Sequence, residues 1–185
     1  MTSRVAGTTR FLYNRGMNKK NLSLIDFRPI TDEDTEFLYN VYASTREEEM
    51  ARTGWDDEQV EAFLRMQFNL QHTQYLQNYK NASFEIILLD KVPIGRLYVD
   101  RRTNEIRVID LSLLTEFRSQ GIGSKIMKDL VAEADKKNLP LNLHVIRNNP
   151  AIRLYERLGF KKVGEAGFHF FIEKPPSHKK MNDEG

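Results

Sequence analysis

The sequence predicts one α/β domain with the element order β-α-α-α-β-β-β-α-β-α-β-β. Residues 106–114 form an apolar, β-branched run, which the glycine-containing loop 118–123 and a helix with an apolar stripe then follow. Residues 141–145 form a second apolar strand, followed by a shorter helical pattern. Composition agrees, because 185 residues with 40% hydrophobic and 29% charged side chains are ordinary for a globular domain with a full core.

The first half of the domain is expected to contain one strand and three helices. Residues 22–27 alternate apolar and polar side chains, which is typical of a strand. Thr31 is expected to cap a helix whose first turn carries acidic residues. Thr45 and Glu48 predict a capping box for a second, short helix. The core-facing positions of the first and third helices are predicted to be Phe37, Leu38, Val41, Tyr42, Val60, Phe63, Leu64 and Phe68.

The second half is expected to supply the rest of the sheet. Residues 84–89 and 94–99 predict a hairpin around the turn 90–93, and residues 101–104 then turn the chain into the strand 106–114. A last hairpin, 161–166 with 168–174, closes the sheet.

Charge and cysteine content exclude several classes of function. With 28 basic and 26 acidic residues, the net charge of +2 is too small to indicate nucleic-acid or membrane attraction. The absence of cysteine removes disulfides, zinc–thiolate sites and a covalent acyl-cysteine route. No apolar run approaches the length of a membrane span. We expect a cytoplasmic monomer or homodimer that needs no metal.

Both ends of the chain differ from the domain between them. Residues 1–21 contain Arg4, Arg10, Arg15, Lys19 and Lys20 and no acidic residue, so a disordered leader is expected. A translation start at Met17 and a targeting peptide are the alternatives. The single domain is expected over residues 22–174, and a polar tail over 175–185.

The loop from Arg118 to Gly123 predicts a phosphate-binding site. Gly121 and Gly123 allow a tight turn with uncovered N–H groups, and the positive end of the following helix favours an anion. Two glycines before a helix are also common in simple turns, so this signal alone is weak.

A second motif makes the prediction specific. In residues 148–160, Asn149 and Pro150 begin a short helix and Gly159 ends it in a left-handed cap. The sequence resembles the GNAT superfamily of acyl-CoA-dependent N-acyltransferases, whose pattern Q/R-x-x-G-x-G/A is matched at Arg118, Gly121 and Gly123. The later family pattern N-x-x-A-x-x-L-Y-E-x-x-G-F is matched from Asn148 to Phe160. The resemblance covers residues 84–174 by motif and residues 22–79 by pattern only.

The resemblance implies a mixed, mostly antiparallel twisted sheet of about seven strands with helices on both faces. It also implies that the strand carrying residues 111–113 has a bulge and splays from the strand carrying residues 143–145, so that the pantetheine arm of acetyl-CoA lies in the gap. The residues implied to bind acetyl-CoA are Leu111, Ser112, Leu113, Arg118, Ser119, Gln120, Gly121, Ile122, Gly123, Ser124, Asn148 and Asn149.

Tyr155 is the expected general acid for the leaving thiolate. It lies about two helical turns after Asn148, which places the two side chains on one side of a helix. A phenol with its reference pKa of about 10 is suited to donate a proton at neutral pH and not to accept one. The alternative is a core tyrosine between Leu154 and Leu158.

The general base is less defined. Asp110 is a carboxylate inside an apolar strand and His144 has a similar place on the next core strand, so burying either without a partner would be unfavourable. Glu105 is a further candidate, and the expected order is Asp110, His144, Glu105. A satisfied polar residue in a strand is the ordinary alternative.

The acceptor site is expected in the first half of the domain. Gln67, Gln71, His72 and Tyr75 share one helix face and could line a pocket with Trp55, although a solvated surface is equally compatible with this spacing. The expected function is acetyl transfer from acetyl-CoA to a primary amine by direct attack in a ternary complex. The alternative is a catalytically silent acetyl-CoA-binding sensor or partner module. A Rossmann domain is disfavoured because residues 141–143 lack the required acidic residue.

Overall fold

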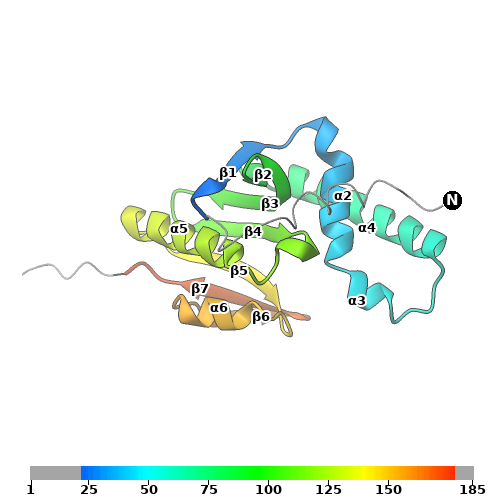
Figure 1. Ribbon diagram of the computed structural model, residues 1–185. Coiled ribbons are helices and arrows are strands. Elements are labelled where there is room, and N and C mark those ends of the chain that lie inside the picture. Colours follow the sequence, from blue (N-terminus) through cyan, green and yellow to red (C-terminus); the bar gives the residue numbers. More distant parts are fainter. Residues whose placement is uncertain (1–21, 178–185) are drawn as a thin grey trace, which may run out of the picture.

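The computed structural model describes residues 22–177, which form one mixed sheet of seven strands in the order β1-β2-β3-β4-β5-β7-β6 (Figure 1). All neighbouring strands pair antiparallel except β4 and β5. The expected fold class and element order are therefore confirmed. The strands are β1 (Ile25–Pro29), β2 (Ser83–Leu89), β3 (Val92–Arg101), β4 (Ile106–Leu113), β5 (Leu141–Ile146), β6 (Lys161–Ala166) and β7 (His169–Lys174).

Helices cover the two faces of this sheet separately. Figure 1 shows α2, α3 and α4 grouped at one side of the domain and α5 and α6 at the other. Their bounds are α2 (Thr35–Ser44), α3 (Glu47–Met50), α4 (Asp57–Asn78), α5 (Ile122–Lys137) and α6 (Ile152–Arg157). Alternate residues of β3 divide between two cores, because Leu97 and Val99 pack with α5 and α6 whereas Tyr98 packs with α2 and α4.

The sheet opens between β4 and β5. Their parallel ladder runs only from Ile106–Leu141 to Val108–Leu143, so the later parts of both strands lie beyond it. A register shift opposite β3 leaves Ile109 as an extra residue in β4, which is the geometry of a β-bulge. The expected bulge and splay are both present.

Gly95 allows β3 and β4 to approach closely beside this opening. A Cβ atom at position 95 would lie 2.3 Å from the main-chain oxygen of Ser112 and 2.8 Å from Cδ2 of Leu113. Because a main-chain atom in a paired strand cannot move aside cheaply, the close pairing here requires glycine.

Several local expectations were wrong. Residues 22–24 form a 3₁₀ turn, and the first strand begins only at Ile25. Thr45 does not cap α3, because its hydroxyl donates back to the Tyr42 carbonyl oxygen at 2.7 Å. The turn between β2 and β3 contains only Asp90 and Lys91, both with positive φ, so β3 begins at Val92.

The start of α6 and the end of the domain also differ from the expectation. The helix α6 begins at Ile152, so Asn148 lies before it, whereas Gly159 has the expected left-handed φ of +90°. Ser177 in the polar tail donates its N–H to Asp135 at 2.8 Å. The predicted leader 1–21 and residues 178–185 lie outside the described residues. Within residues 22–177, no helix has both the length and the apolar character needed to cross a membrane.

Candidate active site

The glycine loop lies between the end of β4 and the start of α5. A 3₁₀ turn (Thr115–Phe117) precedes it, and Ser119 and Gly121 have φ values of +57° and +83°. Ile122 is fully buried and anchors the first turn of α5. No atom lies within 4 Å of a Cβ placed at Gly123, so this helix start faces open space. The geometry matches an anion site built from main-chain N–H groups.

The Arg118 side chain is bonded to groups of the protein itself. Its Nε donates to the Leu113 carbonyl oxygen at 2.8 Å, and its Nη2 donates to the Ser44 hydroxyl at 2.8 Å. Gln120 is similarly engaged, because its Nε2 donates to the Glu116 carbonyl oxygen. The loop therefore offers mainly its backbone to a ligand.

Leu111, Ser112 and Leu113 lie beside the opening, as expected. Each pairs with β3 on one side, whereas the parallel ladder with β5 has already ended at Val108. Leu111 and Leu113 pack against the core under α5, and the Ser112 hydroxyl donates to Asp110 at 2.6 Å. The remaining edge of β4 can pair with an extended ligand as an added strand would.

Asp110 belongs to a buried ion pair. Its Oδ2 lies 2.7 Å from Nη2 of Arg96, and the two side chains are 11% and 2% exposed. The same Arg96 nitrogen donates to Oε1 of Gln71 on α4 at 3.0 Å. Arg96 and Ser112 thus hold both oxygens of the Asp110 carboxylate, and this arrangement favours a positioning role over that of a general base.

Tyr155 lies on α6 with only 9% of its surface exposed, and it packs against Phe160. Burial, with a smaller contribution from the negative charge of Asp110, raises the pKa of Tyr155 to about 12. Tyr155 shares a hydrophobic cluster with Val145 of β5 and with Leu113 of β4, so its ring lies on the face of the sheet beneath the two strands that flank the opening. At neutral pH the phenol therefore carries its proton, as an acid must.

The other two base candidates occupy different surroundings. His144 is exposed on β5, just after the last residue paired with β4, and its ring lies 4.9 Å from that of Phe171. Partial burial and the nearby charge of Arg107 lower the pKa of His144, which keeps the imidazole neutral at pH 7. Glu105 lies at the closed end of β4, where Arg102 and Asn142 donate to its carboxylate at 2.7 and 2.8 Å.

Neither asparagine caps α6 as expected, because the residue before the helix is Ala151 and no side chain accepts from the first turn; Asn149 instead holds the turn that leads into the helix. Its Oδ1 accepts the N–H of Ala151 at 2.8 Å, whereas Asn148 is exposed in the preceding turn. Because Asn148 precedes the helix, its expected helical phase with Tyr155 does not apply. Asn148 remains available to a ligand.

The five predicted acceptor residues separate into two groups. Gln71, His72 and Tyr75 lie in a polar and aromatic layer between α4 and the sheet. Gln67 lines a pocket between α2, α3 and α4 instead. Trp55 does not line this pocket, but its ring packs 5.3 Å from that of Phe63, which does.

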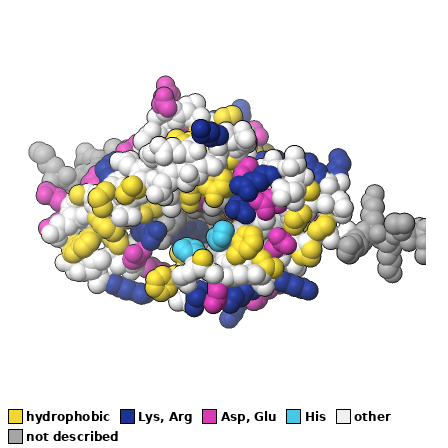
Figure 2. All heavy atoms as spheres, turned by 180° about the vertical axis from the view of Figure 1, so that it is seen from behind, with side chains coloured by type: hydrophobic (Ala, Val, Ile, Leu, Met, Phe, Trp, Pro, Cys, Tyr) yellow, Lys and Arg dark blue, Asp and Glu magenta, His cyan; other side chains and the backbone are white. Residues whose placement is uncertain are grey.

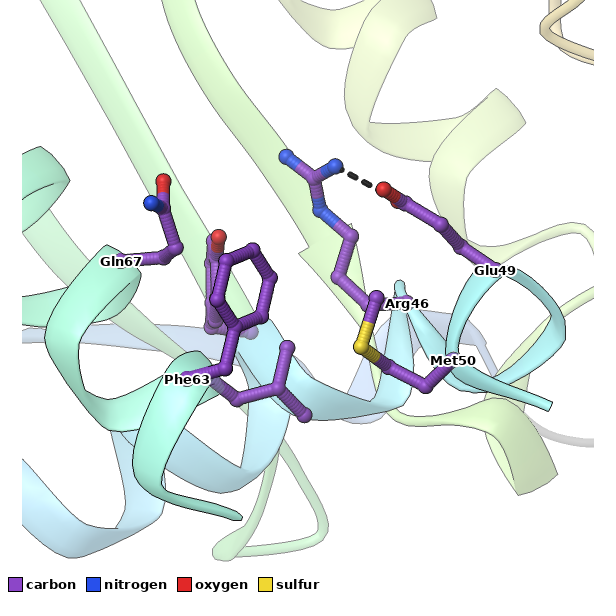
Figure 3. Close-up of a pocket in the computed structure, with 7 residues that line it drawn as sticks. Arg46, Glu49, Met50, Phe63 and Gln67 are labelled. Carbon is purple, nitrogen blue, oxygen red and sulfur yellow. Dashed lines mark hydrogen bonds and ion pairs between the residues drawn. The ribbon is translucent and has the colours of Figure 1, made fainter. Parts of the chain in front are cut away.

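That pocket has a volume of about 130 Å³, and Figure 3 shows its lining side chains converging from the three helices. Arg46 and Glu49 lie on the same side of it, opposite Phe63 and Gln67, and form an ion pair of 2.8 Å. Apolar contacts come from Met50 and Phe63. We call it the α2–α4 pocket, lined by Tyr42, Arg46, Glu49, Met50, Phe63, Leu64 and Gln67.

Sequence reasoning missed Arg96 and Tyr98 on β3. Burial raises the pKa of Tyr98 to about 12, and burial with the charge of Arg96 lowers the pKa of His72. Arg96 interrupts an apolar strand just as Asp110 does, so the same argument from burial could have identified both members of the pair.

Figure 2 shows the molecule from behind, with a hollow near the centre of this face. Histidine side chains lie at the edge of the hollow and basic side chains lie within it. Among residues 22–177, no cluster of histidine and carboxylate side chains could hold a metal ion.

Known proteins share this architecture. The model of the acetyltransferase (GNAT) family matches residues 35–160. PaiA N-acetyltransferase from Thermoplasma acidophilum, solved in complex with coenzyme A, has a TM-score of 0.61 at 24% identity, over 82% of this chain and 98% of that one. The structure of PH1933 from Pyrococcus horikoshii has a TM-score of 0.61 at 21% identity, over 83% and 99%. These two likenesses concern the fold.

A curated relative adds a sequence match. The uncharacterized N-acetyltransferase CgeE of Bacillus subtilis is 29% identical over 87 residues, which are 44% of this chain and 34% of that protein. The match thus spans about a third of the relative's length. Because the family model covers more than half of the 185 residues, the chain belongs to the GNAT family of acetyltransferases.

Proposed function

We propose that this protein transfers an acetyl group from acetyl-CoA to a primary amine by direct attack in a ternary complex. The observation that carries the proposal is a buried, protonated Tyr155 beside an open strand edge that leads into a glycine loop at a helix start. An anion site, an extended-ligand site and an acid in one place are what acyl transfer from a coenzyme A thioester requires.

The coenzyme would be held mainly by backbone groups. Pyrophosphate oxygens would accept N–H groups of residues 119–124, and the amides of pantetheine would pair with residues 111–113. Asn148, exposed at the other side of the opening, would contact the pantetheine region. The Asn149 side chain holds the turn that leads into α6 and would not take this role.

In the reaction, the neutral amine attacks the thioester carbonyl carbon, and the carbon–sulfur bond then breaks. The departing thiolate takes the phenolic proton of Tyr155. A raised pKa keeps this phenol protonated but makes it a weaker acid, so the proton is expected to move as the carbon–sulfur bond breaks. The phenolate then recovers its proton from solvent.

The proton that the amine loses must go to a base or to water. His144 is neutral at pH 7 and lies at the start of the opening, so we assign it this role, directly or through water. The amine acceptor would bind in the α2–α4 pocket, near Gln67 and Trp55. The polar layer that contains Gln71, His72 and Tyr75 would lie between this pocket and the opening in the sheet.

A turnover assay tests the proposal. The full chain is incubated with acetyl-CoA and a panel of polyamines, amino acids, aminoglycosides and peptides with free N-termini, and release of the free thiol is followed. We expect release above the uncatalysed rate with at least one class of amine. Coenzyme A binding without turnover for any class would favour the sensor module, and no binding would refute the proposal.

Coenzyme A calorimetry on glycine variants tests the loop itself. Gly121→Val should weaken binding strongly, because a β-branched residue at a φ of +83° distorts the loop and narrows the approach to its N–H groups. Gly167→Val is the control, since Gly167 also has positive φ but lies in the β6–β7 turn; a Cβ atom there would meet open space, and at Gly121 it would make only an ordinary contact of 3.7 Å with Leu22. Equal loss in both variants would refute the loop assignment.

A further inference from the structure

We propose that Arg118 is a positioning residue that couples the coenzyme loop to the α2–α4 pocket. This inference rests on the proposed function, because it takes the loop as the coenzyme site and the pocket as the acceptor site. Arg118 is the first residue of the glycine motif. In this proposal its side chain links the coenzyme site to the acceptor site and does not bind phosphate.

The Arg118 guanidinium joins the end of β4 to the end of α2. Its Nε is held by the carbonyl oxygen of Leu113 and its Nη2 by the hydroxyl of Ser44, each at 2.8 Å. Arg118 precedes Ser119 and Gly121, whose left-handed conformations shape the loop. Movement of the loop on binding an anion would therefore move this guanidinium as well.

Ser44 is well placed to pass such a movement on. It is the last residue of α2, is 9% exposed, and donates its own hydroxyl proton to the Val41 carbonyl oxygen at 2.8 Å. The hydroxyl oxygen is thereby oriented to accept from Arg118. Tyr42 and Arg46, two positions before and after Ser44, both line the pocket.

A second contact between the same regions is weaker. The Thr115 hydroxyl lies 3.5 Å from a carboxylate oxygen of Glu47, and both side chains are exposed. At that distance a hydrogen bond contributes little, so the coupling depends on Arg118. Linkage requires the effect to be reciprocal, so that occupation of either site changes affinity at the other by the same factor.

The chain contains its own reporter for the pocket. Trp55 is the single tryptophan of the 185 residues, and it is 45% exposed at the start of the segment that leads into α4. Its ring packs 5.3 Å from the ring of Phe63, which lines the pocket. A change in the pocket should therefore change the emission of Trp55.

The experiment follows coenzyme A binding by calorimetry and by Trp55 emission in wild type, Ser44→Ala and Thr45→Ala. Thr45 is a matched control, because its hydroxyl also donates to the carbonyl three residues earlier. We expect coenzyme A to shift the emission of wild type and Thr45→Ala alike. In Ser44→Ala, affinity should stay within about threefold of wild type while most of the emission change is lost.

Arg118→Lys provides a second break in the same contact. Lysine keeps the charge but lacks the planar fork that reaches Leu113 and Ser44 together, so it should lose the emission response as Ser44→Ala does. Melting curves show whether each variant is folded. If either Ser44→Ala or Arg118→Lys fails to fold, the remaining variant is used for the comparison with wild type.

Two kinds of result would contradict the proposals, and they can be told apart. Coenzyme A binding to wild type with unchanged Trp55 emission would overturn the coupling, and so would a full response in Ser44→Ala and Arg118→Lys. Failure of wild type to bind coenzyme A would instead refute the proposed function, which separates the two failures.

Discussion

Replacing Asp110 distinguishes a positioning carboxylate from a general base. In Asp110→Ala, the Arg96 guanidinium would stay buried, with a side chain only 2% exposed, and would lose its ion-pair partner at 2.7 Å. Removing one member of a buried ion pair lowers the free energy of unfolding by about 3–5 kcal/mol. Gln71 still accepts from Arg96 at 3.0 Å, so we expect the lower end, about 3 kcal/mol.

Asp110→Asn should be milder. The amide oxygen can still accept a charge-assisted hydrogen bond from the Arg96 guanidinium, but the negative charge that compensates Arg96 is lost. The expected loss is about 1–1.5 kcal/mol. For a domain of this size, the loss of about 3 kcal/mol expected for Asp110→Ala corresponds to a melting temperature lower by roughly 6–12 °C.

The assay combines urea unfolding with single-turnover acetyl transfer to whichever amine the panel identifies. A positioning role predicts lower stability with the rate per folded molecule retained within a few-fold. The double variant Arg96→Met with Asp110→Ala should recover part of the lost stability, because no unpaired charge remains buried. A rate loss of about 10²-fold or more at unchanged stability would refute this reasoning and make Asp110 the base.

Three further predictions concern the acid, the sheet and pH. Tyr155→Phe should hardly change coenzyme A affinity but should slow single-turnover transfer by about 10²-fold or more, and an unchanged rate with a lower melting midpoint would make the residue structural. Gly95→Ala should lower the free energy of unfolding by at least about 2 kcal/mol in urea titration, because its Cβ would lie 2.3 Å from a main-chain oxygen; Gly123→Ala, with open space around it, is the control. The hydrogen bonds with Arg28 are the main reason that the pKa of Asp34 is lowered to about 2. Because the pKa in the unfolded chain is near 4, the ionised carboxylate stabilises the fold fully above pH 4, and this stabilisation is lost as pH falls through 2. The unfolding free energies of wild type and Asp34→Asn should therefore differ by at most about 2 kcal/mol at pH 6 and converge toward pH 2.

Sequence reasoning succeeded where the signal is local. The strand–loop–helix unit around Gly121 and the left-handed cap at Gly159 follow from periodicity and from glycine conformation, both of which act over a few residues. The prediction from sequence was wrong where one side chain could form either of two short-range hydrogen bonds. Thr45 could cap the next helix or bond back to its own, and packing selected the second.

By itself, the sequence determined the order of the elements, the glycine loop at the start of α5 and the tyrosine-containing motif that predicted the family. Tertiary structure alone decided which side chains meet: Arg96 with Asp110 through the β3–β4 register, and Arg118 with Ser44 across 74 positions. It also separated Gln67, at the pocket, from Gln71, at the sheet, although both lie on α4. The physical reason is that backbone conformation depends on near neighbours in the chain, whereas the partner of a buried polar group depends on strand register and helix packing over the whole domain.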